Sequence, residues 1–176
     1  MFIQKSFELK QEEEEFIKFL LSDSFPWYFQ PTTTDRFMFF GHALMKRDPE
    51  HKPVSGLVSS PYYTICENIF IRFCQENNIK IKNILRAAVN MTLYDPAEVN
   101  DIHIDHKFEH YNFLMYLNEF DNGCTLIYDK DLKMTKKIMP KKYDAVVFGG
   151  EPHAHQHCAV GQRRLVLVVT FTMENI

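Results

Sequence analysis

The chain has 176 residues, of which 45% are hydrophobic and 24% are charged, and its formal net charge is −3. This length and composition predict a single globular domain over residues 1–176 and exclude a disordered or fibrous chain. The small negative charge gives no general attraction to nucleic acid or to an anionic membrane, so partners must be inferred from local sites.

The first predicted element is an amphipathic helix within residues 8–23. Phe16, Ile17 and Leu20 recur at helical spacing, and a run of four glutamates precedes them, where the helix dipole favours negative charge. The segment Phe25–Ser60 then combines an aromatic cluster and several turn signals with one short strand, RFMFFGHALM. We expect this segment to form a cover or lid.

A second helix is predicted from Ser60 onward. Ser60 is a suitable N-cap, Pro61 suits the first helical position, and apolar residues follow at helical spacing as far as Phe73. Residues 1–80 should therefore supply helical support and the lid for a β core formed by residues 81–176.

After Lys80 the pattern changes to short β-type segments separated by turn signals. Strict alternation in RAAVNMTLY places Ala87, Val89, Met91 and Leu93 on one face and Arg86, Asn90, Thr92 and Tyr94 on the other. A strand with one apolar and one polar face suits a sandwich or barrel that packs helices outside and holds a ligand inside.

The sequence also carries information on location. Its first 21 residues are acidic where a secretory signal would have a basic region and then a continuous apolar run, and no later stretch is long enough to span a bilayer. We therefore expect a cytoplasmic protein without membrane contacts. The four cysteines form no CxxC pair, so free thiols are expected.

Six of the eight histidines fall in two short stretches, DIHIDHKFEH and PHAHQH. In an extended strand His103 and Asp105 project from the same face. Together with a histidine from a distant strand they would form the facial triad of non-haem iron(II), which leaves coordination positions open. The third ligand could be His153, His155 or His157, because all three alternate along one strand.

Two consecutive arginines, Arg163 and Arg164, open the strongly β-branched strand that follows the second histidine stretch. An arginine offers a planar fork that can bind a carboxylate through two charge-assisted bonds.

From Arg86 to Phe171 the order of motifs resembles a known family. The chain reads LYDP, HID, LMYLNEFDNGCT, PKKYDAVVF, then His153, and then a basic residue ten or eleven places later. This order is similar to that of the iron(II)- and 2-oxoglutarate-dependent oxygenases, in their prolyl 4-hydroxylase-like branch and especially its short, phage-type members.

The resemblance implies a mainly β fold with flanking helices, a double-stranded β-helix or cupin-like jelly roll. It implies His103, Asp105 and His153 as iron ligands, and Arg163 or Arg164 as the residue that binds 2-oxoglutarate, with Tyr94 as a second contact. The cofactors would be Fe(II), 2-oxoglutarate as cosubstrate, and O2. The activity would be hydroxylation of a C–H bond in a peptidyl (for example prolyl) or small-molecule substrate, with release of succinate and CO2.

Other interpretations stay open at this stage. PHAHQH could belong to a zinc or cupin-like metal-binding protein, and six lysines within residues 129–142 could follow phosphates in an AlkB-like nucleobase oxygenase. DIHIDH resembles the HxHxDH motif of β-lactamase-type metallo-hydrolases, but Asp101 stands where the first histidine belongs. His106 and His110 are expected at the surface or in support of the ligands. The sequence does not predict an oligomeric state.

Overall fold

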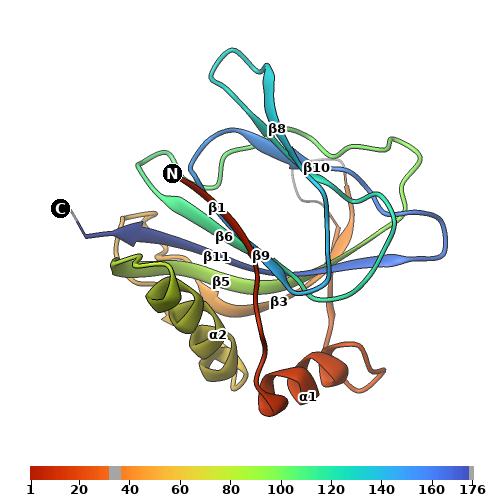
Figure 1. The fold of residues 1–176 in the computed structure, drawn as a ribbon, viewed down its shortest axis with the longest axis horizontal. Helices are drawn as coiled ribbons and strands as arrows, with labels where there is room; N and C mark the ends of the chain where they lie inside the picture. The colour runs from red at the N-terminus through yellow and green to blue at the C-terminus, as the bar shows by residue number, and fades with distance from the viewer. Residues whose placement is uncertain (32–36, 175–176) are drawn as a thin grey trace.

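The structure is a computed structural model, and it describes residues 1–31 and 37–174. Its strands form two antiparallel sheets that face each other, with the helices on the outer side of the larger one (Figure 1). The large sheet has the order β1 (Phe2–Ser6), β9 (Asp144–Gly149), β6 (Tyr111–Tyr116), β11 (Arg163–Met173), β5 (Ile81–Leu93), β3 (Phe39–Lys46) and β2 (Tyr28–Gln30), with β4 (Leu57–Val58) paired to β3. The small sheet has the order β10 (His153–His155), β7 (Thr125–Tyr128) and β8 (Met134–Ile138). The predicted mainly β jelly roll is confirmed.

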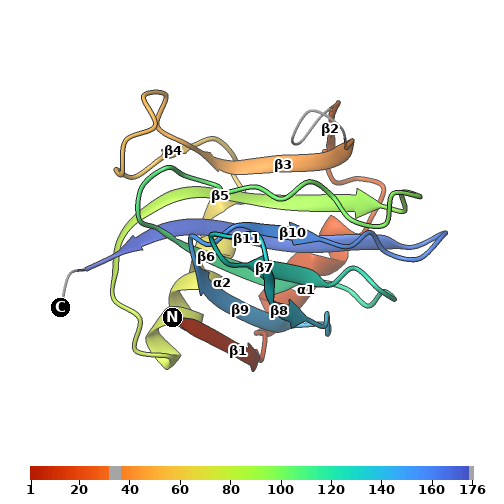
Figure 2. The ribbon, with the colours of Figure 1, turned by 90° about the horizontal axis from the view of Figure 1, so that it is seen from above.

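The central strands of the large sheet are apolar on the face turned to the helices. Figure 2 shows β3, β5, β11, β6, β9 and β1 side by side, with the small sheet lying across them. β11 pairs with β5 from Arg163↔Leu93 to Met173↔Ile81 and with β6 from Val166↔Tyr116 to Phe171↔Tyr111. This register sets the two faces of the sheet: odd-numbered residues of β11 such as Leu167 face the helices, and even-numbered ones face the small sheet.

The two predicted helices are α1 (Gln11–Leu20) and α2 (Tyr63–Glu76). α2 begins after the predicted position because the Ser60 hydroxyl accepts the backbone N–H of Tyr62 at 3.2 Å and lies 2.7 Å from Nε2 of His42. Ser60 therefore forms a turn before the helix rather than its N-cap. The helices are joined by an ion pair between the buried Glu13 and Arg72.

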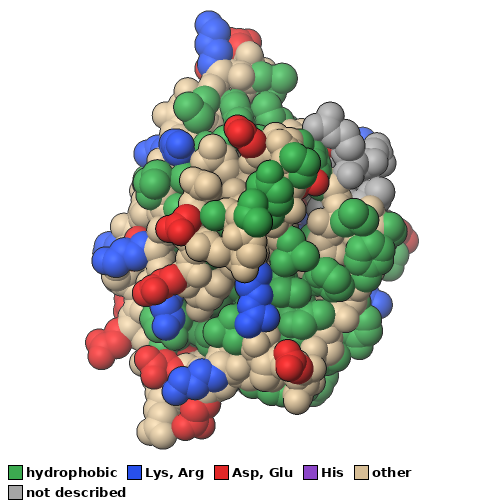
Figure 3. Space-filling view, turned by 90° about the vertical axis from the view of Figure 1, so that its right-hand side faces the viewer, with side chains coloured by type: hydrophobic (Ala, Val, Ile, Leu, Met, Phe, Trp, Pro, Cys, Tyr) green, Lys and Arg blue, Asp and Glu red, His purple; other side chains and the backbone are tan. Residues whose placement is uncertain are grey.

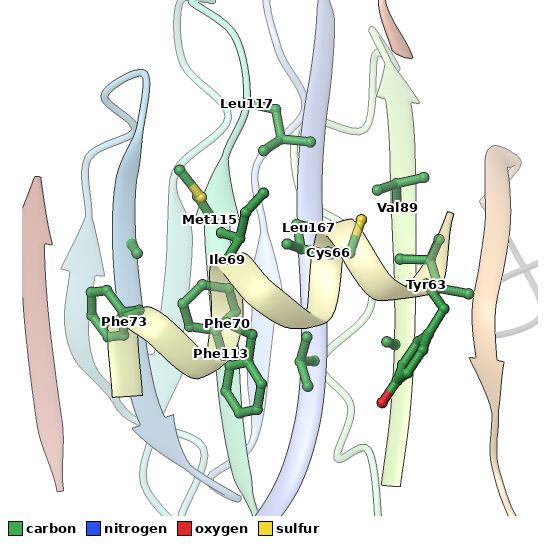
Figure 4. Packing of buried hydrophobic residues seen from close by; sticks show 14 of the residues in the cluster. Tyr63, Cys66, Ile69, Phe70, Phe73, Val89, Phe113, Met115, Leu117 and Leu167 are labelled. Carbon is green, nitrogen blue, oxygen red and sulfur yellow. The ribbon is translucent and has the colours of Figure 1, made fainter. Parts of the chain in front are cut away.

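The main hydrophobic core lies between α2 and the large sheet (Figure 4). Cys66, Ile69, Phe70 and Phe73 project from one side of α2, and Phe70 meets Phe113 of β6 at 5.2 Å between ring centroids. This packing buries the apolar face of the helix against the apolar face of the sheet, as the alternation in β5 predicted.

Ile69→Val should lower the free energy of unfolding by about 1 kcal/mol, because it removes one methylene from a fully packed site. Urea denaturation followed by circular dichroism would measure this. Val160→Ala is the matched control, since the side chain of Val160 is 74% exposed and its truncation should change stability by less than about 0.5 kcal/mol. Equal losses in the two variants would contradict the described packing.

Two features differ from the sequence-based expectations. The strand predicted at RFMFFGHALM is β3, but it belongs to the large sheet and not to a separate cover: it pairs with β5 from Phe40↔Met91 to Met45↔Ala87. Residues 32–36 of the predicted cover or lid, Phe25–Ser60, lie outside the described residues. β1 was not predicted, and it adds to the edge strand β9. Residues 1–80 thus supply strands as well as helical support.

The surface carries hydrophobic side chains that gather on one side of the face shown in Figure 3, with charged side chains around them. The six lysines predicted near the site lie on and beside β8, whose first four residues are exposed. All four cysteines are buried free thiols, as predicted. Neither helix of the described chain has the length and apolar character that crossing a bilayer requires.

Candidate metal centre

His103 and His153, fifty positions apart in the chain, are brought together by an isolated antiparallel β-bridge. The backbone N–H of His103 donates to the carbonyl of His153 at 3.0 Å, and the reverse bond measures 2.9 Å. Residues directly opposite in such a bridge place their side chains on the same face. The two imidazole rings accordingly lie with their centroids 4.5 Å apart.

Asp105 completes a cluster of three groups that could hold a metal ion. One donor atom from each of His103, Asp105 and His153 lies within 4.8 Å of the other two, and His153 Nε2 is 3.4 Å from Asp105 Oδ2. These distances suit three ligands on one face of an ion.

The tautomers of both histidines follow from their backbone partners. His103 Nδ1 lies 3.0 Å from the carbonyl of Asp101, and His153 Nδ1 lies 3.0 Å from the carbonyl of Glu151. A carbonyl oxygen only accepts, so each Nδ1 must donate its proton, which leaves the lone pair of Nε2 available to a metal in the neutral ring.

The charges at the cluster support the same donor set. Burial by itself would raise the pKa of Asp105, but the hydrogen bond from His153 and the positive charges of His153, Arg86 and Arg47 outweigh it and lower the pKa below its usual value. Burial and the neighbouring His153 lower the pKa of His103. The contact with Asp105 raises the pKa of His153 against the effect of burial. The cluster therefore offers one ionised carboxylate and one neutral imidazole, and His153 becomes the second imidazole donor when it gives up the proton that it shares with Asp105.

The cluster lies in the wall of a cavity of about 550 Å³ between the two sheets. Asn90, Thr92 and Asn112 also line this cavity, and each has a buried side-chain oxygen without a hydrogen-bond partner in the described chain. Buried polar atoms are normally paired. The unpaired ones here mark a space built for a polar ligand.

The two arginines at the start of β11 point in different directions. Arg164 lines the cavity and is only 3% exposed; its Nε donates to the carbonyl of Gly123 at 3.1 Å and its Nη2 to the hydroxyl of Thr125 at 3.2 Å. Arg163 lies outside the cavity and donates to the carbonyl of Leu21 at 2.8 Å. The alternation of β11 thus separates two residues that the motif spacing could not distinguish.

Tyr94 does not line the cavity with the metal cluster. It lies just beyond the end of β5, its side chain is 48% exposed, and it borders two shallow surface pockets. Three of the four residues predicted on the polar face of this strand, Arg86, Asn90 and Thr92, line the cavity. The fourth, Tyr94, does not.

The remaining histidines of the two stretches are buried or partly buried, not at the surface. His155 lines the same cavity with an unpaired Nε2, and burial and then the charge of Arg164 lower its pKa well below the usual range. His157 packs against Phe37. His106 meets the hydroxyl of Thr170 at 2.8 Å, and His110 meets the carbonyl of Phe108 at 2.8 Å.

Sequence reasoning missed three residues at the site. Arg47, which follows β3, donates from Nη2 to Asp105 Oδ1 at 2.7 Å, and Arg86 reaches the same oxygen at 4.0 Å. Thr125, whose hydroxyl accepts a hydrogen bond from Arg164, is the last residue of the motif LMYLNEFDNGCT, but no role was assigned to it from the sequence. Arg86 was placed on the polar face of its strand, but no sequence signal pointed to Arg47, whose position depends on the pairing of β3 with β5.

Comparisons with known proteins agree with this geometry. Residues 89–172 match the model of the 2OG-Fe(II) oxygenase superfamily. The fold is similar to an oxidoreductase of the 2OG-Fe(II) oxygenase family from Burkholderia pseudomallei, with a TM-score of 0.75, 14% identity, and coverage of 99% of this chain and 86% of that chain. It is also similar to a Pseudomonas putida prolyl-4-hydroxylase (TM-score 0.57, 16% identity, 99% and 93% covered) and to OsALKBH1 (TM-score 0.62, 16% identity, 97% and 96% covered). No curated protein matches the sequence. The family match confirms the resemblance inferred from the motifs.

Proposed function

We propose that the chain is a 2-oxoglutarate- and iron(II)-dependent oxygenase that hydroxylates a C–H bond of a small-molecule or peptidyl substrate at the cluster of His103, Asp105 and His153. The observation that carries this proposal is the position of the cluster in one cavity with the buried Arg164. The cluster would hold the metal ion, and the guanidinium group of Arg164 would bind an anionic group of a ligand in the same cavity.

The three ligand residues each have a defined role. His103 and His153 would offer Nε2, because the Nδ1 of each faces a backbone carbonyl, and Asp105 would offer Oδ2 while Arg47 holds Oδ1. The Nε2 of His153 lies 3.4 Å from Asp105 Oδ2 without a metal and would bind an ion only as the neutral ring. When bound here, iron(II) together with 2-oxoglutarate and O2 supplies the oxidant that places one oxygen atom on the substrate, with succinate and CO2 as coproducts.

Arg164 is the residue that we assign to the distal carboxylate of 2-oxoglutarate. Its bonds to Gly123 and Thr125 fix the guanidinium before any ligand arrives, so little side-chain entropy remains to be lost on binding. The hydroxyl of Thr125 is in turn held 2.8 Å from that of Tyr116. A fixed planar fork binds a carboxylate with two parallel bonds, which a flexible lysine cannot do.

Part of the cavity wall is apolar. Leu114, Phe148, Val166 and Val168 line the cavity from the strands of the large sheet. These side chains offer no hydrogen-bond partner, so a polar ligand here would be oriented by the polar residues that share the lining.

The test is an anaerobic titration of the metal-free protein with Fe(II) and then 2-oxoglutarate, in which the chelated cosubstrate should produce a visible charge-transfer band. Succinate formation in air is the second readout. A protein that gives no band and instead binds zinc tightly would favour the zinc or cupin-like interpretation.

A second candidate, nucleobase oxidation, is favoured by the exposed lysines on and beside β8 and by the similarity of the fold to OsALKBH1. Leu132, which precedes β8, lines a second cavity of about 920 Å³, the outer cavity, which His103 and Asp105 also line, so this hairpin lies near the metal cluster. Oligonucleotides that increase succinate formation at low salt and lose this effect at moderate salt would support this candidate. Indifference to every oligonucleotide would exclude it.

A further inference from the structure

Two arginines converge on the metal cluster from neighbouring strands of the large sheet. Arg47 immediately follows β3, Arg86 lies within β5, and the pairing Met45↔Ala87 places them close together. Both guanidinium groups approach Asp105 Oδ1, at 2.7 Å for Arg47 and 4.0 Å for Arg86.

The two arginines are not equivalent. Arg47 forms a direct hydrogen bond that turns Oδ2 of Asp105 toward His153, so Arg47 is a positioning residue for the carboxylate. Its Nε is nevertheless buried without a partner in the described chain. One donor of this group is therefore still available to a ligand.

Arg86 has no hydrogen-bond partner within residues 1–31 and 37–174, and its only ion pair is the long one to Asp105. Its side chain is 25% exposed and lines the cavity that holds the metal cluster. A guanidinium group removed from most of its water needs an anion or several acceptors to offset the lost hydration. Asp105, which is shared with Arg47, does not supply these bonds.

The positive charges around the site outnumber the negative ones, which favours the binding of an anion. Asp105 is the only acidic residue among the described residues that line either the inner or the outer cavity, whereas Lys46 and Lys107 add positive charge. Three arginines and a bound iron(II) ion outweigh Asp105 and the two carboxylates of 2-oxoglutarate in formal charge. A negatively charged substrate would complete the balance.

We propose that Arg86, with the free donor of Arg47, binds an anionic group of the substrate, and that the substrate is a small organic acid with a carboxylate or phosphate near the C–H bond that is oxidised. This inference rests on the proposed function and gives it a substrate class. A small molecule is favoured because Arg86 lies in the inner cavity, whose volume of about 550 Å³ falls in the range of small-molecule sites.

The test uses the iron- and 2-oxoglutarate-loaded protein with matched pairs of acidic and neutral compounds. The pairs are the standard L-amino acids with their amides, and glycerol 3-phosphate with glycerol, which separate carboxylate from phosphate recognition. Two readouts are recorded: the shift of the visible band without O2, and succinate formation with O2. The active compounds should be acids whose neutral counterparts are inactive.

Arg86→Gln should raise the acid concentration that gives half of the band shift by about tenfold or more, which corresponds to one charge-assisted hydrogen bond. Arg86→Lys should recover part of this loss. Lys82→Gln, which removes an exposed charge from the same strand, should have no effect. A third readout uses the metal-free protein. The NMR signal of the Arg86 Nε–H group is identified by its absence in Arg86→Gln, and it should shift when the active acid is added but not when the amide is added.

Three outcomes would overturn the inference: no acid shifts the band, only neutral compounds, peptides or oligonucleotides act, or Arg86→Gln weakens 2-oxoglutarate binding as much as substitution of Arg164 does. The last outcome would assign Arg86 to the cosubstrate. A wild-type protein that forms no band at all would instead refute the oxygenase site itself, so the two failures are distinguishable.

Discussion

His153→Ala should abolish the visible band formed with Fe(II) and 2-oxoglutarate and weaken iron binding by more than about 100-fold. The substitution removes one of three donor atoms that lie within 4.8 Å of each other. Changing a residue that only supports a metal ligand costs about 10- to 100-fold in affinity, so loss of a ligand should cost more. Anaerobic titration followed by absorbance, with iron content measured after desalting, would give both quantities.

His155→Ala is the matched control, because His155 lies on the same short strand and lines the same cavity. Its Nε2 is unpaired but lies outside the cluster of donor atoms, so the band should persist. The opposite pattern, with the band lost in His155→Ala and retained in His153→Ala, would move the third ligand by two positions. Unfolding in urea should be measured for both variants, so that loss of fold is not mistaken for loss of a ligand.

The part of the site that follows from strand alternation could be predicted from the sequence. HID places His103 and Asp105 on one face in any extended segment, and RAAVNMTLY separates a polar from an apolar face before any partner strand is known. The polar residues of that strand do line the cavity, and Val89 of the opposite face does pack in the core.

Strand alternation alone could not choose among His153, His155 and His157, because the choice depends on register between distant segments; the order of motifs in the family resemblance favoured His153. Only the bridge between His103 and His153 decides which of three alternating histidines faces Asp105. The same limit applies to Arg47, which reaches Asp105 only because β3 joins the large sheet instead of forming a lid. Pairing between distant segments leaves no local periodicity in the sequence.

β1 shows a second limit. Four of its five residues are exposed, since it is an edge strand that covers little apolar surface, and its sequence therefore lacks the alternation that identified the other strands. Its pairing with β9 depends on the edge being available in the folded sheet. This is a tertiary condition and not a local one.

Arg164→Met should weaken 2-oxoglutarate binding by about 100-fold or more, and Arg164→Lys by about tenfold. Methionine removes the charge and both bonds of the fork, each charge-assisted bond being worth about 1.5–3 kcal/mol, whereas lysine keeps a point charge without the planar geometry. The dissociation constant follows from the amplitude of the visible band as 2-oxoglutarate is added under anaerobic conditions.

Arg163→Met is the matched control for this prediction. Arg163 is adjacent in sequence, but its guanidinium lies outside the cavity and bonds to the carbonyl of Leu21, so cosubstrate affinity should change by less than about twofold while stability falls slightly. Arg164 is buried and bonded to Gly123 and Thr125, so its replacement by methionine should also lower the stability of the sheet. Arg164→Lys retains most of the side-chain volume, and therefore separates the loss of stability from the loss of 2-oxoglutarate binding. The assignment would be wrong if Arg163→Met lost 2-oxoglutarate binding while Arg164→Lys bound it normally. The cosubstrate would then bind on the opposite face of β11, beside Arg163.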